Sequence, residues 1–316
     1  GVQRELFPMP SVDSTLSRLT GAKVFSKLDA KSGFWQIPLS QSSQLLTTFI
    51  TPHGRYCFTR LPFGISSASE FFQKRFSEVI DGVEGAVNHI DDVLVWGRTQ
   101  EEHDRRLRET LNRLKGANVT LNHKCEISRS QVKFLGHIIG EDGIKPDPDK
   151  VSAVLTMTAP TDVASLRRFL GMANQLNKFT PKLAELTKPL RDLLSNKTQW
   201  LWSAAQDTAF QKVKQELTNS PTLAWYDASK VTKVSADASS YGIGCVILQK
   251  HGEHWKPAAY ASRSLSDTEQ RYAQIEKEAL AVTWACERFA ELLVGKQFMI
   301  ETDHKPLVPL LGCKAL

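Results

Sequence analysis

The sequence has no long apolar segment and no paired cysteines. No apolar run approaches the length of a membrane span, and the first residues do not have the pattern of a signal peptide. The five cysteines have no Cys-x-x-Cys spacing and are Cys57, Cys125, Cys245, Cys286 and Cys313. A disulfide framework and a zinc site are therefore not indicated, and a reducing compartment is the default expectation.

The chain also lacks a strong imbalance of charge. Its 40 basic and 34 acidic side chains leave a net charge of +6, which favours a polyanionic partner only weakly. With 41% hydrophobic and 23% charged residues, the composition is typical of a globular protein. A length of 316 residues predicts two or three domains.

Two adjacent carboxylates, Asp91 and Asp92, stand out between two short β-branched runs at residues 86–87 and 93–96. The runs predict paired strands, with the acidic pair at the tip of a tight hairpin. Neighbouring carboxylates repel each other and raise each other's pKa, and a bound divalent cation would remove that cost. A solvated Asp-Asp turn is the simpler interpretation of the pair alone.

A third carboxylate, Asp29, follows residues 24–28, which alternate like a half-buried strand. It is therefore expected at a strand end, where it can face the hairpin tip if the strands share a sheet. Three carboxylates on two strand ends are the minimum for a two-metal phosphoryl-transfer site.

Several spaced blocks support this interpretation. They are Pro8-Met9-Pro10, Lys27-Leu28-Asp29 with Gly33-Phe34, Leu61-Pro62-Phe63-Gly64, Ile90-Asp91-Asp92 and Phe134-Leu135-Gly136. In their order and spacing the chain, from Val2 to Leu316, resembles the reverse transcriptase of Gypsy-type LTR retrotransposon Pol polyproteins. The resemblance implies an α+β right-hand polymerase fold, with partial fingers and palm at 1–140 and a helical thumb or linker at 141–222. A C-terminally truncated RNase H-like mixed α/β domain is expected at 223–316.

The resemblance also implies roles for individual residues. Two Mg²⁺ ions, or Mn²⁺ in their place, would be held by Asp29, Asp91 and the carbonyl of Ala30, with Asp92 as a supporting carboxylate. The nucleotide site would comprise Ala30, Lys31, Ser32, Gly33, Phe34, Phe63 and Gly64, with the backbone N–H groups of residues 30–33 facing the triphosphate. The primer grip would comprise Phe134, Leu135 and Gly136. Phe34 would be the steric gate that excludes a ribose 2′-OH, although its alternative is a plain core residue.

A second acidic set lies in the C-terminal third. The strand pattern of residues 231–236 leads to Asp237, a long helix is expected over 267–293, and a last strand at 298–302 ends in Asp303. A strand-end Asp, a helix Glu and a strand-end Asp in this order resemble the RNase H of retroelements. The resemblance implies that Asp237, Glu278 and Asp303 hold two more Mg²⁺ ions, with Glu276 as the alternative glutamate.

Further patterns predict local structure. Capping boxes are expected at Ser67–Glu70, Thr99–Glu102 and Ser203–Gln206. Residues 47–58 predict a hairpin, and residues 132–139 a strand that Gly136 interrupts so that another backbone can approach. The helix after Thr99 is expected to bury a stripe made by Leu107, Leu111 and Leu114.

Two positions depart from the family pattern, namely Leu46, where many members have lysine, and His89, where Tyr or Phe is usual. We expect His89 to fill space. We also expect further fingers strands before residue 1 and a fourth RNase H carboxylate beyond residue 316.

The implied function is an RNA- and DNA-directed DNA polymerase joined to an RNase H. Its partners would be an RNA template, a DNA primer, an RNA–DNA hybrid and dNTPs, without a membrane, and the resemblance allows a homodimer. The implied location is the cytoplasm, in retroelement particles. The alternative is a catalytically silent retroelement fragment that retains only nucleic-acid binding.

Overall fold

The computed structural model describes residues 7–195 and 198–311, so Val2 and Cys313 lie outside the described residues. Its contacts divide the chain into two compact units. The first comprises Gly1–Leu135 and Ile139–Glu141, and the second Gly136–Ile138 and Asp142–Leu316. No helix in the described ranges is both long enough and apolar enough to cross a membrane.

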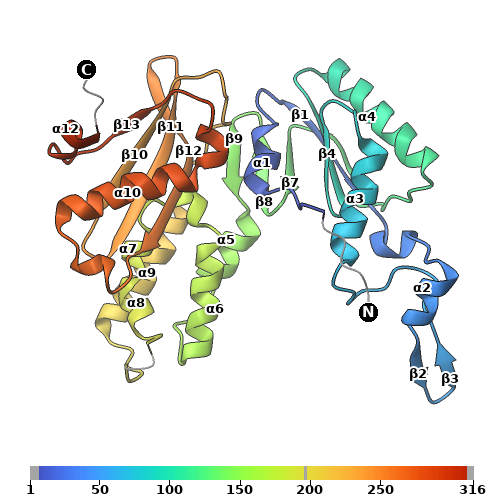
Figure 1. Ribbon diagram of the computed structural model, residues 1–316, viewed down its shortest axis with the longest axis horizontal. Helices are drawn as coiled ribbons and strands as arrows, with labels where there is room; N and C mark the ends of the chain where they lie inside the picture. Colours follow the sequence, from blue (N-terminus) through green and yellow to red (C-terminus); the bar gives the residue numbers. More distant parts are fainter. Residues whose placement is uncertain (1–6, 196–197, 312–316) are drawn as a thin grey trace. The chain divides into compact units, whose positions relative to one another are not determined.

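The first unit is built on a four-stranded sheet in the order β4-β5-β1-β6. Two of its strands, β1 and β4, are labelled in Figure 1. Its strands are β1 (Val24–Asp29), β4 (Ala86–His89), β5 (Asp92–Gly97) and β6 (Glu126–Arg129). β4 and β5 are antiparallel neighbours, with His89 opposite Asp92. The predicted hairpin with the acidic pair at its tip is therefore confirmed.

Helices α3 (Ala68–Ile80) and α4 (Gln100–Gly116) pack on one face of this sheet. The shared core contains Leu28, Phe72, Phe76, Val93, Val95, Leu107 and Leu114. Because successive strand residues point to opposite faces, the even-numbered Leu28 turns toward the helices and Asp29 turns away from them. The helices thus form a support on the face opposite the side chains of Asp29 and its strand partner Asp92.

The sequence predicted the two helices but not all their details. Ser67 makes no side-chain cap on α3 within the described residues, so that capping box was wrong. Thr99 does accept from the Glu102 N–H, whereas the Glu102 side chain accepts from the Arg98 N–H instead of completing a box. Leu111 is 36% exposed because the buried stripe of α4 passes through Thr110.

The first unit also contains several short elements. They are α1 (Val12–Ser17), the 3-10 helix η1 (Gly33–Gln36), α2 (Gln41–Leu46), β2 (Phe49–Thr51) and β3 (Gly54–Tyr56). The antiparallel pair β2–β3 confirms the predicted hairpin.

A separate sheet contains β7 (Gln131–Phe134), β8 (His137–Gly140) and β9 (Gly143–Pro146). The single interrupted strand predicted for 132–139 was therefore wrong, because the chain turns back at Leu135 and Gly136, which both have positive φ. A Cβ atom on Gly136 would overlap the end of the Lys150 side chain. A flexible side chain, not another backbone, approaches this glycine.

The second unit begins with helices that share one apolar cluster, which includes Leu166, Phe169 and Phe210. They are α5 (Pro148–Leu155), α6 (Val163–Asn174), α7 (Leu183–Leu186), α8 (Lys188–Asp192) and α9 (Ala204–Thr218). The 3-10 helix η2 (Asn177–Phe179) connects α6 to α7. The predicted capping box of Ser203 and Gln206 is present at the start of α9.

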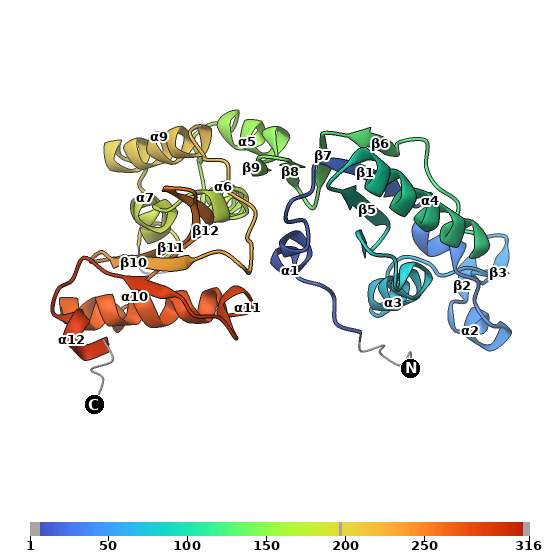
Figure 2. The same cartoon turned by 90° about the horizontal axis from the view of Figure 1, so that it is seen from above.

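A second four-stranded sheet, in the order β12-β11-β10-β13, completes the second unit. Its strands are β10 (Thr232–Ala238), β11 (Gly242–His251), β12 (His254–Ser264) and β13 (Met299–Glu301). Its helices are η3 (Glu269–Arg271), α10 (Gln274–Arg288), α11 (Ala290–Leu293) and α12 (Leu307–Leu311). Figure 2 shows α10 on one face of this sheet and α7 on the other. The helix predicted over 267–293 was too long, since α10 begins at Gln274 and ends at Arg288.

Candidate active sites

Backbone pairing brings the three N-terminal carboxylates to one end of the first sheet. Asp29 is directly opposite Asp92 in the β1–β5 ladder. The Ala30 N–H donates to the carbonyl of Asp91 at 2.9 Å, which fixes the hairpin turn against the end of β1. Asp29 and Asp92 are half-buried and Asp91 is exposed.

The three carboxylates are not equivalent. Asp92 Oδ2 lies 3.1 Å from Lys27 Nζ, whose positive charge partly compensates it. Burial raises the pKa of Asp92, the neighbouring Asp91 and Asp29 add to that effect, and Lys27 opposes it. With Asp92 paired to a lysine, Asp29 and Asp91 offer the accessible oxygens that suit a hard divalent cation.

The segment expected to bind nucleotide passes beside Asp91. A Cβ atom on Gly33 would lie 2.9 Å from the ring of Phe72 and 3.3 Å from the Cβ of Asp91, so only glycine allows this approach. The N–H groups of Ala30 and Lys31 donate to the carbonyls of Asp91 and Thr120, each at 2.9 Å. These two N–H groups are therefore already used, unlike the sequence-based expectation that they face a triphosphate.

Phe34 lies between two other aromatic rings. Its centroid is 5.4 Å from that of Phe72 in the core and 5.4 Å from that of Phe63, which is 68% exposed. Phe34 is half-buried, with one side packed on the core. Gly64 follows with positive φ and open space around it.

The residues expected to form a primer grip differ in accessibility. Phe134 is fully buried, so its side chain is core. Leu135 and Gly136 are half-buried and form the tip of the β7–β8 turn. Of these three residues, Leu135 and Gly136 are the ones that a ligand can reach.

The residues that depart from the family pattern lie near these elements. His89 is half-buried opposite Asp92, and its Nδ1 has no hydrogen-bond partner among the described residues. Leu46 ends α2 and is 70% exposed.

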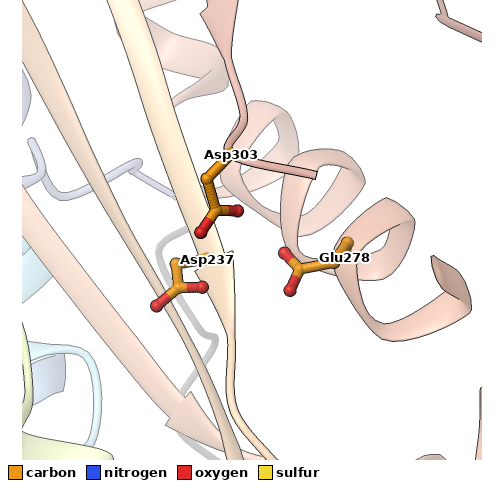
Figure 3. A group of neighbouring side chains, drawn as sticks. All are labelled: Asp237, Glu278 and Asp303. Carbon is orange, nitrogen blue, oxygen red and sulfur yellow. The ribbon is translucent and has the colours of Figure 1, made fainter. Parts of the chain in front are cut away.

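The second acidic set forms a tighter cluster. Asp237 lies in β10, Glu278 in α10 and Asp303 just after β13, which runs parallel to β10. One ligand oxygen from each lies within 4.8 Å of the others, and within the described ranges this is the one acidic, His or Cys group that meets that limit. Figure 3 shows the three carboxylates turned toward a common space.

Glu278 is the buried member of this cluster. It is 4% exposed, and burial, followed by the charges of Asp237 and Asp303, raises its pKa. Its Oε1 accepts from Gln274 Nε2 at 2.7 Å, whereas its Oε2 has no partner in the described part of the chain. A buried, unpartnered carboxylate oxygen beside two other carboxylates fits a divalent cation.

The alternative glutamate has another task. Glu276 is exposed and its Oε2 accepts from the Ala273 N–H at 2.8 Å, which caps the start of α10. Gln274, which the sequence reading missed, also donates to the Ala238 carbonyl at 2.8 Å and so ties α10 to the strand that carries Asp237. Its i, i+4 spacing from Glu278 is the signal that could have found it.

A sheet with three carboxylates at one end, followed by a sheet-and-helix unit with a compact acidic cluster, defines the class of reverse transcriptases with an attached RNase H-like domain. Residues 2–139 match the reverse transcriptase (RNA-dependent DNA polymerase) family, and residues 202–300 match the RNase H-like domain found in reverse transcriptase. The second match begins before α9, upstream of residue 223.

Solved structures are similar to this chain over its whole length. The fold is similar to the foamy viral protease-reverse transcriptase dRH in complex with double-stranded DNA (TM-score 0.87, 24% identity, 100% of this chain and 57% of that one). It is also similar to the foamy viral protease-reverse transcriptase in complex with RNA/DNA hybrid (TM-score 0.80, 24% identity, 100% of this chain and 43% of that one). These likenesses confirm the predicted α+β polymerase fold with an RNase H-like domain.

The retrovirus-related Pol polyprotein from transposon opus of Drosophila melanogaster is 38% identical over 323 residues, with 98% of this chain and 32% of that protein covered. The transposon Tf2-3 polyprotein of Schizosaccharomyces pombe is 33% identical over 313 residues, with 97% and 24% covered. The chain belongs to the reverse transcriptase and RNase H-like region of Gypsy-type LTR retrotransposon Pol polyproteins. It spans about a third or less of the curated relatives it matches.

Proposed function

We propose that the first unit extends a DNA primer on an RNA or DNA template. The observation that carries the proposal is the pairing of Asp29 with Asp92, together with the bond from the Ala30 N–H to the Asp91 carbonyl. Together, this strand pairing and this hydrogen bond hold the three carboxylates at one end of the sheet. The proposed division is palm and fingers at 1–140, thumb at 141–222 and RNase H-like domain at 223–316.

The proposal assigns a role to each residue of the polymerase site. Asp29, Asp91 and the Ala30 carbonyl would hold Mg²⁺, while Lys27 keeps Asp92 as a supporting carboxylate. Ser32 and Gly33 would offer backbone N–H groups to the triphosphate, beside Lys31. Phe34, backed by Phe72, would exclude a ribose 2′-OH, and the exposed Phe63 with Gly64 would contact the incoming nucleotide. The Leu135–Gly136 turn, anchored by Phe134, would position the primer.

We propose that the second unit cleaves the RNA strand of an RNA–DNA hybrid at Asp237, Glu278 and Asp303. The unpartnered buried oxygen of Glu278 supports this assignment, because it is an acceptor for which the described residues provide no donor. At either site, bound Mg²⁺ supplies a Lewis acid that activates the attacking hydroxyl or water and stabilises charge on the phosphate. The carboxylates would hold the Mg²⁺ ions in place.

The proposed partners are an RNA template, a DNA primer, an RNA–DNA hybrid and dNTPs, in retroelement particles of the cytoplasm. The foamy viral relatives were solved with double-stranded DNA and RNA/DNA hybrid, and a net charge of +6 favours the same polyanions here.

Primer extension on an RNA template with Mg²⁺ and dNTPs tests the polymerase function. Asp29→Asn should abolish extension, whereas Asp81→Asn, which changes an exposed Asp of the same unit, should not. If neither this chain nor a longer polyprotein containing it extends the primer, the silent nucleic-acid-binding fragment becomes the better interpretation.

A further inference from the structure

A buried glutamine on α3 contacts the backbone of the turn that carries Asp91. Gln73 is 1% exposed. Its Oε1 accepts from the Ile90 N–H at 2.6 Å, and its Nε2 donates to the Asn88 carbonyl at 3.1 Å. One side chain therefore binds polar backbone groups on both sides of His89.

The turn is one that needs outside support. β4 and β5 are joined by the two residues Ile90 and Asp91, and Ile90 has a φ of 54°. A two-residue hairpin turn with positive φ at its first position normally has glycine there, and a β-branched residue in this region is an outlier. Such strained conformations persist only where the surrounding structure holds them.

We propose that Gln73 is a positioning residue for the polymerase reaction: it holds the Ile90–Asp91 turn, and through it the Asp91 carboxylate. Ala30 holds the same turn from the other side through the Asp91 carbonyl. Between these two contacts the turn has little freedom to move. The inference rests on the proposed polymerase function of the first unit.

Two variants of the full chain provide matched controls for Gln73→Met, which keeps the side-chain volume and removes both backbone bonds. Ser77→Ala removes a 3.2 Å bond from Gln73 and a 2.9 Å bond to the Asn88 side chain but leaves the turn backbone bonded. Gln249→Met removes a similar buried clamp in the second unit, where Gln249 binds the N–H and the carbonyl of Asp227 at 2.7 and 2.8 Å.

The readouts are steady-state primer extension and hydrogen exchange of the Ile90 amide. Gln73→Met should lower kcat about 10²-fold, the effect of a small misplacement of a reacting group, with the KM for primer–template unchanged. It should also raise the Mg²⁺ concentration needed for half-maximal activity and speed exchange at Ile90. Ser77→Ala and Gln249→Met should keep kcat and Ile90 protection near wild type.

Other results would overturn the inference. A kcat for Gln73→Met equal to that of Ser77→Ala would do so, as would a fall in kcat with Ile90 still protected. If the wild-type chain does not extend primers, the proposed function fails by itself. Exchange at Ile90 then decides separately whether Gln73 holds the turn, since that measurement needs no activity.

Discussion

Glu278 has an environment that is unfavourable without a cation. Its carboxylate is buried beside two others, and one of its oxygens has no partner within the described ranges. An unpaired buried charge destabilises a fold, whereas a ligand that binds only the folded state stabilises it. Its role should therefore be visible in stability as well as in catalysis.

For the metal-free chain at neutral pH, Glu278→Gln should raise the thermal unfolding temperature of the second unit. Added Mg²⁺ should then stabilise the wild type, by about 2.7 kcal/mol at a hundredfold excess over Kd, and leave Glu278→Gln unchanged. Glu276→Gln is the matched control: its amide oxygen can still accept from the Ala273 N–H and cap α10, and it should keep the Mg²⁺ response. Thermal unfolding with and without Mg²⁺ measures this, and an equal response of both variants would remove Glu278 from the site.

A substitution of Phe34 tests the proposed nucleotide pocket at the level of a single residue. Phe34→Ala should raise ribonucleotide incorporation about tenfold, because the ring no longer fills the space of the 2′-OH. Trp35→Ala, which changes the neighbouring exposed ring, should leave selectivity unchanged. Competitive incorporation of rNTPs and dNTPs measures the ratio. Unchanged selectivity in Phe34→Ala would make Phe34 a core residue.

Among the elements, those defined by short-range pattern could be predicted from the sequence. The β-branched runs around Asp91 predicted a hairpin, and the alternation before Asp29 predicted a strand end. The elements that could not be predicted from the sequence depend on tertiary contacts. β12 is one such element: it contains Trp255 and Pro257, and its apolar and polar residues do not alternate cleanly. It forms a strand because it pairs along nearly its whole length with β11. Likewise, nothing local distinguishes the Leu135–Gly136 turn from a strand with one glycine.

The start of α10 is another element that tertiary contacts decide. Arg263 at the end of β12 makes two bonds to Glu269, at 2.8 and 2.9 Å, and lies over the ring of Trp284 on α10. It therefore links β12, η3 and α10. Residues 267–273, which precede α10, do not extend this helix toward the N-terminus because Glu269 is held by Arg263 and by the Ser266 N–H.

This ion pair predicts a pH dependence of stability. The Arg263 side chain and the Ser266 N–H lower the pKa of Glu269 from 4.5 to about 2. A carboxylate with a lowered folded-state pKa adds stability that is present above 4.5 and is lost as the pH falls toward 2.

Glu269→Gln should therefore destabilise the chain by about 1 kcal/mol at pH 7, a modest value because the pair is partly exposed. The difference from wild type should shrink as the pH falls through the window between about 4.5 and 2. Denaturant unfolding at several pH values measures it. The exposed Glu253→Gln serves as the control, and a difference that stays constant with pH would contradict the assignment.

On the scale of the whole molecule, the chain contains two acidic sites on two separate sheets. The sheet of β1, β4, β5 and β6 supports one site, and the sheet of β10 to β13 supports the other. Each sheet has its own apolar cluster, and each acidic site lies within one compact unit. Because the sites share no core residues, damage to one should not propagate to the other.

Asp91→Asn should therefore abolish Mg²⁺-dependent primer extension and leave cleavage of the RNA strand in a hybrid near wild type. Asp237→Asn should have the reverse effect, because it removes a carboxylate from the second cluster only. Both activities are measured on one labelled RNA–DNA hybrid with a recessed primer, so that extension and cleavage are read from the same reaction. If either single substitution removed both activities, the two sites would not be independent. Loss of extension in Asp91→Asn with cleavage intact would assign polymerisation to the first unit and hydrolysis to the second.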